Sequence, residues 1–435
     1  MRLHLKNIGK LAEADVVIDG ITVIAGENDT GKSTVGKILY SVFNSFYDFE
    51  KQIQAARISL FSMSVKKEFT EKYNDYDINS VAIAEDLFNR NDDEITTELI
   101  ENLIKDNIDD TWSLISLGLD GDTVKFTVSD GFIQFVLNTY YLYTKGVSDK
   151  TIYGNIFNRQ IRSTFNTQIQ NIYSMDECSI LLEINHKSVA ILIDDNIVKG
   201  LNETLSLKTE IMYIDNPFIL DEWLLYTVNT SQFATSGVYY RVKLLQKLMK
   251  GTSNDGVEEA LKEIIVSERI KPILAKIQRA CSGNLEFKQK DGFSYISGGS
   301  TKNISINNIS TGLKTFIILK TLLTNGSIEQ NGTIILDEPE IHLHPEWQIL
   351  FAEIIVLLQK EFNLHILLTT HSPYFLEAIE VYSEKYKINN KCKYYLADNT
   401  GDVSNIIDVT NNTEEIYKKL ARPFQDLENA RYSDD

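Results

Sequence analysis

The sequence has 435 residues, 43% of them hydrophobic and 24% charged, which is the composition of a globular protein that can bury a core. Its 61 acidic and 43 basic residues give a net charge of −18, which argues against a surface that binds nucleic acid throughout but leaves room for a local basic groove. The 3 cysteines form no CxxC pair, which fits a reducing compartment. The sequence has no apolar run of the length that a secretion signal or a membrane span needs, so we expect a cytoplasmic protein with no membrane partner.

Three short strands are predicted at the N-terminus, over residues 3–8, 12–18 and 21–26. The third is a continuous apolar run, as in strands that are buried on both faces. The segment GENDTGKST follows it directly, and residues 35–53 then carry apolar side chains at helical spacing. A strand, a glycine-bounded loop and a helix are therefore expected in that order.

The middle of the chain is predicted to be an insertion, residues 51–204, that is mostly helical and ends in a β-hairpin at residues 179–196. A strand-like stretch at residues 122–132 interrupts its helical pattern. A further strand is expected at residues 210–217, and long charged faces predict a helical lobe over residues 218–282.

Strands and helices alternate in the second half. The expected elements, in order, are a hairpin at 285–297, a loop and helix at 308–323, a strand at 332–340, a helix at 345–362, a strand at 364–373, short strands near 391–397 and 403–409, and a last helix. This alternation predicts an α/β fold with a mixed sheet covered by helices, together with an antiparallel β subdomain and the helical lobe. We expect the main domain in residues 1–50 and 205–425, and a tail in residues 426–435.

The loop after the third strand fits the pattern GxxxxGK[ST], in which backbone amides and a helix N-terminus surround phosphate oxygens. Lys32 is predicted to reach the β- and γ-phosphates and Ser33 to place its hydroxyl on Mg²⁺. The alternative, a glycine turn with an incidental lysine, is disfavoured by the flanking strand and helix. The predicted nucleotide-binding residues are Gly26, Glu27, Asn28, Asp29, Thr30, Gly31, Lys32, Ser33 and Thr34.

An acidic pair, Asp337 and Glu338, follows the apolar run TIIL. A strand there carries both residues to the carboxyl edge of the sheet, where open α/β folds bind their ligands. Asp337 is the predicted Mg²⁺ carboxylate, and Glu338 the predicted general base that acts on water. Taken alone, such a pair is more often a solvated turn, so the prediction depends on its combination with the phosphate loop.

Two further segments can contribute polar groups. Ser310, Thr311 and Gly312 precede a predicted helix and could hold a phosphate, although a serine before a helix is equally explained as an N-cap. His371 follows another buried strand and would lie beside Asp337 if the two strands are neighbours, where it could hydrogen-bond the γ-phosphate. A histidine at the edge of the core is the alternative.

Two histidines in the loop after the acidic pair, His342 and His344, lie near Glu340 and Glu346. Their spacing lacks the i, i+4 helical geometry of a zinc motif, so a metal site of these residues is disfavoured.

Taken in order, GENDTGKST, ISTGLK, ILDEPEIHLHP and TTHSP resemble the ABC-type ATPase superfamily, in its branch of overcoming-lysogenisation-defect proteins and of recombination and chromosome-maintenance ATPases. The pair DEPEIHLHP and TTHSP is similar to the ATPases of bacterial anti-phage systems. The resemblance covers residues 1–50 and 205–425, so it implies an ABC-type ATPase head and leaves the insertion uncovered.

The resemblance implies ATP and Mg²⁺ as cofactors and a head-to-head dimer. Lys32 of one subunit would bind each ATP, and the signature segment of the other subunit would cap it through Ser310, Thr311, Gly312 and Lys314. Asp337 would be the magnesium aspartate, Glu338 the catalytic base and His371 the switch histidine, while residues 341–345 would couple the two sites. The position of the family's glutamine loop is left open, because its expected place near residues 215–217 holds no glutamine, and no Mg²⁺ ligand is predicted from that side.

The function implied is ATP hydrolysis by a dimer that controls a separately encoded effector, such as a nuclease or toxin, in anti-phage defence of the Septu or Paris kind. The effector is expected to be separate because no topoisomerase-primase nuclease domain is found in the sequence. The alternative is a DNA-repair or chromosome-associated ATPase that clamps DNA, which the net charge disfavours. A transporter subunit fits the segment DEPEIHLHP poorly.

Overall fold

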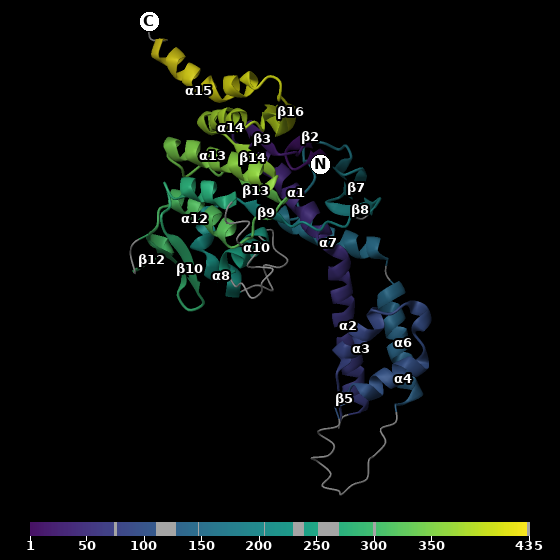
Figure 1. Ribbon diagram of the computed structural model, residues 1–435. Coiled ribbons are helices and arrows are strands. Elements are labelled where there is room, and N and C mark those ends of the chain that lie inside the picture. Colours follow the sequence, from purple (N-terminus) through teal and green to yellow (C-terminus); the bar gives the residue numbers. More distant parts are fainter. Residues whose placement is uncertain are drawn as a thin grey trace. The chain divides into compact units, whose positions relative to one another are not determined.

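The computed structural model describes residues 1–73, 76–109, 128–146, 148–203, 205–228, 239–250, 269–298 and 302–432. The chain forms two compact units, one made of Met1–Tyr47 with Gly154–Asp435 and the other of Asp48–Tyr153 (Figure 1). Among the described helices, none combines the length and the apolar character needed to cross a membrane.

The first unit is built on an 11-stranded mixed sheet in the order β8-β7-β6-β1-β2-β16-β15-β3-β14-β13-β9. The strands β15, β3, β14, β13 and β9 run parallel, and antiparallel pairs extend the sheet from β1 to β8. Their bounds are β1 Arg2–Ile8, β2 Leu11–Val17, β3 Ile21–Gly26, β6 Cys178–Ile184, β7 Lys187–Asp194, β8 Ile197–Leu201, β9 Ile211–Ile214, β13 Thr333–Asp337, β14 His365–Thr370, β15 Cys392–Thr400 and β16 Val403–Asp408.

The parallel strands are apolar along their length because helices cover both faces of the sheet. Ile334 and Leu336 of β13 belong to the large core that includes side chains of α12, α13 and α14, whereas Ile335 between them faces Gly36 of α1. The helices of this unit are α1 Lys32–Phe46, α8 Trp223–Val228, α10 Tyr239–Met249, α12 Thr311–Thr324, α13 Pro345–Phe362, α14 Pro373–Lys385 and α15 Glu414–Tyr432, with short turns η2 Pro217–Leu220, η3 Ile306–Asn308 and η4 Asn389–Lys391.

A second, antiparallel sheet of three strands lies in the same unit, with β10 Asn284–Lys288, β11 Gly292–Ile296 and β12 Asn303–Ser305. The predicted α/β class, with a mixed sheet, an antiparallel β part and helices, is thus confirmed. Of the predicted helical lobe, η2, α8, α10 and helical residues 269–277 are described, while residues 229–238 and 251–268 lie outside the described part.

The predicted hairpin at residues 179–196 forms, as β6 and β7, but it is part of the first unit. The strand β6 pairs with β1 along five residue pairs and buries Cys178, Ile180 and Leu182, so it extends the main sheet. The sequence grouped this hairpin with the insertion because local alternation does not reveal which strand a hairpin joins. The compact second unit is correspondingly shorter than the predicted insertion and ends at Tyr153.

The second unit has a core of its own, in which Phe61, Phe69 and Phe132 are fully buried. Its elements are α2 Phe49–Lys72, β4 Asp77–Ile78, α3 Ser80–Phe88, η1 Asp92–Glu94, α4 Thr97–Asp106, β5 Ile108–Asp109 and α6 Asp130–Lys145, and α7 Asp149–Thr164 continues into the first unit. Most of the strand-like stretch predicted at residues 122–132 lies outside the described residues, and its last three residues begin α6 instead.

Candidate functional site

The phosphate loop, the acidic pair and His371 meet at the carboxyl edge of the main sheet, because three neighbouring parallel strands end there. The strand β14 lies between β3 and β13, and Asp337 of β13 pairs with Thr369 of β14. The strands before Asp337 and His371 are therefore neighbours, which is the condition under which His371 was placed beside Asp337.

The phosphate loop closes tightly between β3 and α1. Gly31 has a φ of 76°, and a Cβ there would lie 2.7 Å from Leu11 Cδ2, so only glycine fits this turn. Lys32 is 4% exposed and its Nζ donates hydrogen bonds to the carbonyl oxygens of Gly26, at 3.1 Å, and Glu27, at 2.6 Å. The loop thus surrounds a buried ammonium group at a helix N-terminus, which is an arrangement suited to an anion.

Asp337 accepts hydrogen bonds from three hydroxyl groups. Its Oδ1 accepts from Ser33 Oγ at 3.0 Å and from Thr369 Oγ1 at 2.6 Å, and its Oδ2 accepts from Tyr213 at 2.7 Å. Burial, and then the Asp337 carboxylate, raise the pKa of Tyr213 well above its ordinary value, so its phenol stays a donor. The Ser33 hydroxyl beside the Asp337 carboxylate is the hard oxygen donor pair that Mg²⁺ takes at phosphate sites, so these residues fit that ion.

Glu338 lies between the ammonium group of Lys32 and the imidazole of His371. Its Oε1 is 3.5 Å from Lys32 Nζ, and its Oε2 is 3.7 Å from His371 Nδ1, an ion-pair separation. The residue has a φ of 49°, and its backbone N–H donates to Thr369 Oγ1 at 3.0 Å. The imidazole of His371, followed by Lys32, lowers the pKa of the Glu338 carboxyl against the opposing effect of partial burial. Glu338 is therefore ionised and able to accept a proton.

Glu340 also lies at this edge, and the sequence analysis considered it only as a ligand of a disfavoured metal site. It is 1% exposed, and its Oε1 accepts hydrogen bonds from the Thr370 hydroxyl and from the His371 N–H. Burial raises the pKa of Glu340, while Glu338 first, and Glu340 next, raise the pKa of His371. Glu340 thus fixes the backbone that carries the predicted switch histidine.

The predicted signature segment begins α12. Ser310 stands at the N-cap position and is exposed, but its side chain makes no capping hydrogen bond, so the capping alternative is not what the structure shows. A Cβ at Gly312 would lie 2.7 Å from the carbonyl oxygen of His342, which explains the glycine. A shallow pocket is lined by Ser310, Thr311, Gly312, His342, His344 and Trp347.

Lys314 corrects the prediction that it reaches a nucleotide from this segment. It is 3% exposed, and its Nζ donates to both carboxylate oxygens of Asp221, at 2.6 and 2.7 Å. Its charge is thus paired inside the protein and is not available to a nucleotide. It ties α12 to the end of η2.

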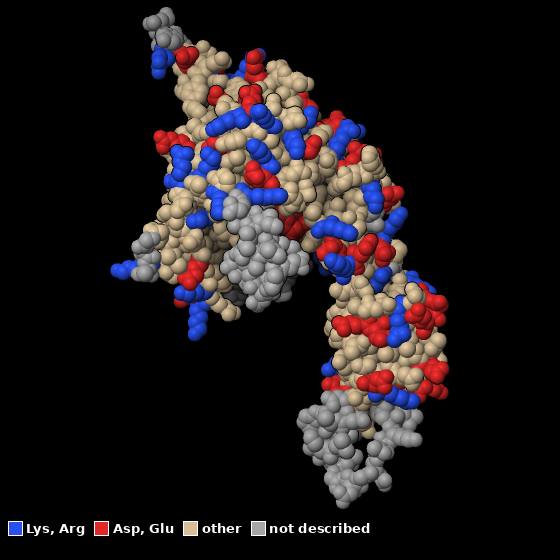
Figure 2. All heavy atoms as spheres, viewed as in Figure 1, with Lys and Arg blue, Asp and Glu red and all other residues tan. Residues whose placement is uncertain are grey.

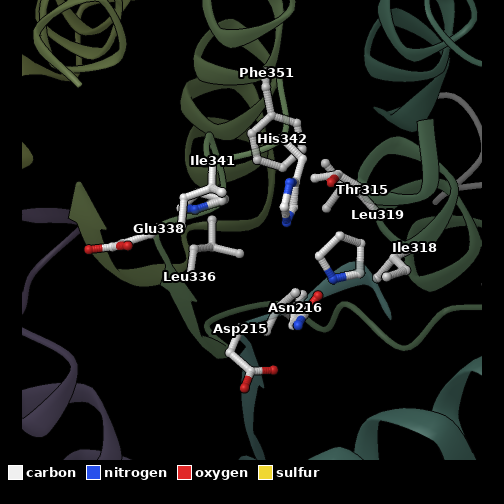
Figure 3. A pocket seen from close by; sticks show the side chains of 13 residues that line it. Asp215, Asn216, Thr315, Ile318, Leu319, Leu336, Glu338, Ile341, His342 and Phe351 are labelled. Atoms are coloured by element: carbon white, nitrogen blue, oxygen red, sulfur yellow. The ribbon is translucent and has the colours of Figure 1, made fainter. Parts of the chain in front are cut away.

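The segment expected to replace the glutamine loop, Asp215 to Pro217, follows β9. Asp215 Oδ2 accepts hydrogen bonds from Tyr240, at 2.7 Å, and from Arg241, at 2.6 Å, so it is tied to α10. Asp215 to Pro217 line an apolar pocket with Leu336, Ile341 and Phe351, and in Figure 3 the carboxylates of Asp215 and Glu338 point away from its centre. The charged chemistry of Glu338 therefore lies outside this pocket.

A family model described as AAA ATPase domain matches residues 1–376 of the chain. The chain belongs to this family. Residues 1–376 thus form an ATPase domain of this family, and the names of two curated relatives likewise describe each of them as a probable ATPase. The family-level part of the sequence interpretation, a nucleotide-binding ATP hydrolase, is thereby confirmed.

The relatives match over short stretches. Retron Vc95 probable ATPase of Vibrio cholerae serotype O1 biovar El Tor is 30% identical over 164 residues, 35% of this chain and 30% of that protein. Retron Ec83 probable ATPase of Escherichia coli is 35% identical over 89 residues, 18% of this chain and 16% of that protein. The matched part is therefore less than a third of either relative.

Among solved structures, the Smc head bound to the C-terminal winged-helix domain of ScpA is 11% identical, with 95% of this chain and 98% of that chain covered and a TM-score of 0.44. At that score the similarity adds nothing to the fold that the strand order already shows.

Two residues of the site were missed by the sequence interpretation. Thr369 could have been found, because a hydroxyl residue at the end of the strand next to Asp337 is expected to face the same edge. Tyr213 had a weaker signal, a tyrosine in a predicted apolar strand that ends near the expected glutamine loop.

Proposed function

We propose that this ATPase binds Mg-ATP at the carboxyl edge of β3, β14 and β13, that ATP brings two copies together head to head, and that this cycle controls a separately encoded effector in anti-phage defence. The observation that carries the proposal is the convergence of Lys32, Ser33 and Asp337, with Glu338 beside them, at one edge of the sheet.

In this proposal Lys32 and the amides of the phosphate loop bind phosphate oxygens. Ser33 and Asp337 hold the Mg²⁺, which when bound neutralises phosphate charge. Glu338 accepts the proton of the attacking water, and His371, 3.7 Å from Glu338, responds to the presence of the terminal phosphate. Each role is assigned to a group that already has the needed charge and neighbours.

The dimer is supported by the exposed start of α12. The Ser310 hydroxyl is exposed and unused by its own helix, and the pocket that Ser310 lines contains no residue of the phosphate loop. A second nucleotide-binding surface on the same chain is what a head-to-head arrangement requires, because each ATP is then held by two subunits.

A place in phage defence is supported by the resemblance of DEPEIHLHP and TTHSP to anti-phage ATPases, and by the two relatives that are named as probable retron ATPases. A Septu- or Paris-like system is the finer proposal and depends on the motif resemblance alone. DNA clamping is the alternative, and Figure 2 shows basic and acidic side chains interspersed over the visible face rather than gathered by sign.

The test uses the purified chain. Lys32→Ala should lose ATP binding, measured with a fluorescent ATP analogue. Glu338→Gln with Mg-ATP should double its mass in light scattering, and adding Ser310→Arg should keep it monomeric while ATP still binds. The exposed Ser305 provides the control, since Ser305→Arg should leave ATP-dependent dimerisation intact.

The head-to-head dimer would be contradicted if the mass of Glu338→Gln were the same with and without ATP. It would also be contradicted if the Glu338→Gln, Ser310→Arg variant still dimerised with ATP. In cells that carry the chain with its neighbouring genes, Lys32→Ala should abolish resistance to phage. Hydrolysis that rises strongly with duplex DNA, without any effect of Lys32→Ala on phage resistance, would favour the DNA-clamping alternative instead.

A further inference from the structure

Tyr213 lies on β9, the edge strand next to β13, with its residue paired to Ile335. Its side chain is 1% exposed, and its hydroxyl donates to Asp337 Oδ2 at 2.7 Å. No part of the phosphate loop or of the acidic pair is on β9, so this strand would otherwise contribute nothing to the predicted magnesium carboxylate.

We propose that Tyr213 is a positioning residue for Asp337, and this inference rests on the proposed Mg-ATP site. Carboxylate torsions are broad and roughly two-fold, so one hydrogen bond leaves an aspartate free to turn. The hydroxyls of Thr369 and Tyr213 hold the two oxygens of Asp337 separately, one each. Together they set the plane of the carboxylate and leave Oδ1 directed at Ser33.

The phenol is itself held in place by neighbouring groups. The Tyr213 ring packs against Tyr240 at a centroid distance of 4.6 Å and edge-on against Tyr40 at 6.1 Å. The ring also lies close to α1, because a Cβ at Gly36 would be 3.2 Å from Tyr213 Cε2. A buried ring packed between α10 and α1 cannot swing its hydroxyl away from Asp337 without disturbing the core.

Tyr240 offers a matched comparison. It packs against the Tyr213 ring, and its hydroxyl also donates a hydrogen bond to a carboxylate. The acceptor is Asp215 Oδ2, at 2.7 Å, and not Asp337. Tyr213→Phe and Tyr240→Phe therefore each remove one buried hydroxyl bonded to an acid, and only Tyr213→Phe frees an oxygen of Asp337.

The experiment measures the binding of a fluorescent ATP analogue to the full chain, first in EDTA and then as Mg²⁺ is added. Tyr213→Phe should bind the analogue in EDTA as the wild type does but need about tenfold more Mg²⁺ for half-maximal enhancement. Tyr240→Phe should follow the wild-type Mg²⁺ curve. The thermal midpoint of unfolding is measured for both variants without nucleotide or Mg²⁺, as the control that each variant is folded at the assay temperature.

A wild-type Mg²⁺ curve for Tyr213→Phe, or an equal shift in Tyr240→Phe, would overturn the positioning role while leaving the Mg-ATP site intact. If Mg²⁺ has no effect on nucleotide binding by the wild type, the proposed site itself fails, and the inference fails with it. The two results are distinguished by the wild-type curve alone.

Discussion

Replacing Glu338 by glutamine tests the role of the proposed base most directly. The amide keeps the size of the side chain and the backbone bond from Glu338 to Thr369, but it cannot accept a proton. General bases contribute about 10²–10⁴-fold to rates, so the barrier should rise by about 3–5 kcal/mol. ATP affinity should stay the same or increase, since the carboxylate that lies 3.5 Å from Lys32 Nζ loses its charge.

The assay is single-turnover hydrolysis at saturating Mg-ATP, with nucleotide affinity measured separately. Glu346 provides a matched control, because it is an exposed acid on the first turn of α13 and Glu346→Gln should hydrolyse ATP at the wild-type rate. A loss of less than about tenfold in Glu338→Gln would show that another group takes the proton, and our reading of the acidic pair would be refuted.

Two more predictions follow from contacts of the same unit. Gly312→Ala places a Cβ 2.7 Å from the His342 carbonyl oxygen, so it should lower the thermal midpoint of unfolding. A Cβ at the helical Gly154 meets nothing within 4 Å, so Gly154→Ala should raise the midpoint. Equal midpoints for the two variants would contradict the contact between Gly312 and the His342 carbonyl. His371, whose pKa Glu338 raises from 6.5, contributes stability that is complete below that value and is lost as pH rises through the higher folded pKa. His371→Ala should therefore lower the midpoint most near about pH 5 and least near about pH 9, and a difference independent of pH would refute this pairing.

The core of the site was predictable because its signals are local. A buried strand, a glycine loop and a helix beginning at Lys32 follow one another in the sequence, and the structure has them as β3, the loop and α1. That the ends of the strands before Asp337 and His371 share one edge follows from a parallel sheet, whereas their direct pairing was left open by the sequence and is shown by the structure.

The missed and wrong assignments concern partners that lie far away in the chain. Tyr213 is 124 residues from Asp337, and nothing in the composition of β9 marks which acid its hydroxyl will meet. Lys314 was assigned to a nucleotide because it belongs to the signature segment of the resemblance, yet Asp221, 93 residues earlier, pairs with its ammonium group. Charge type is readable from a sequence, whereas the direction in which a side chain faces depends on tertiary packing.

The loop after the acidic pair illustrates how such distant partners bear on function. Gln348 Nε2 donates to the Leu343 carbonyl at 3.0 Å, and its Oε1 accepts from Ser372 at 2.7 Å, one residue beyond His371. At its other side the same loop presents the His342 carbonyl to Gly312. Packed groups with fixed hydrogen bonds do not move independently, so a displacement of the segment around His371 should also displace the start of α12. The coupling role that the motif resemblance implies for residues 341–345 stays a prediction, and these contacts are the ones through which it would act.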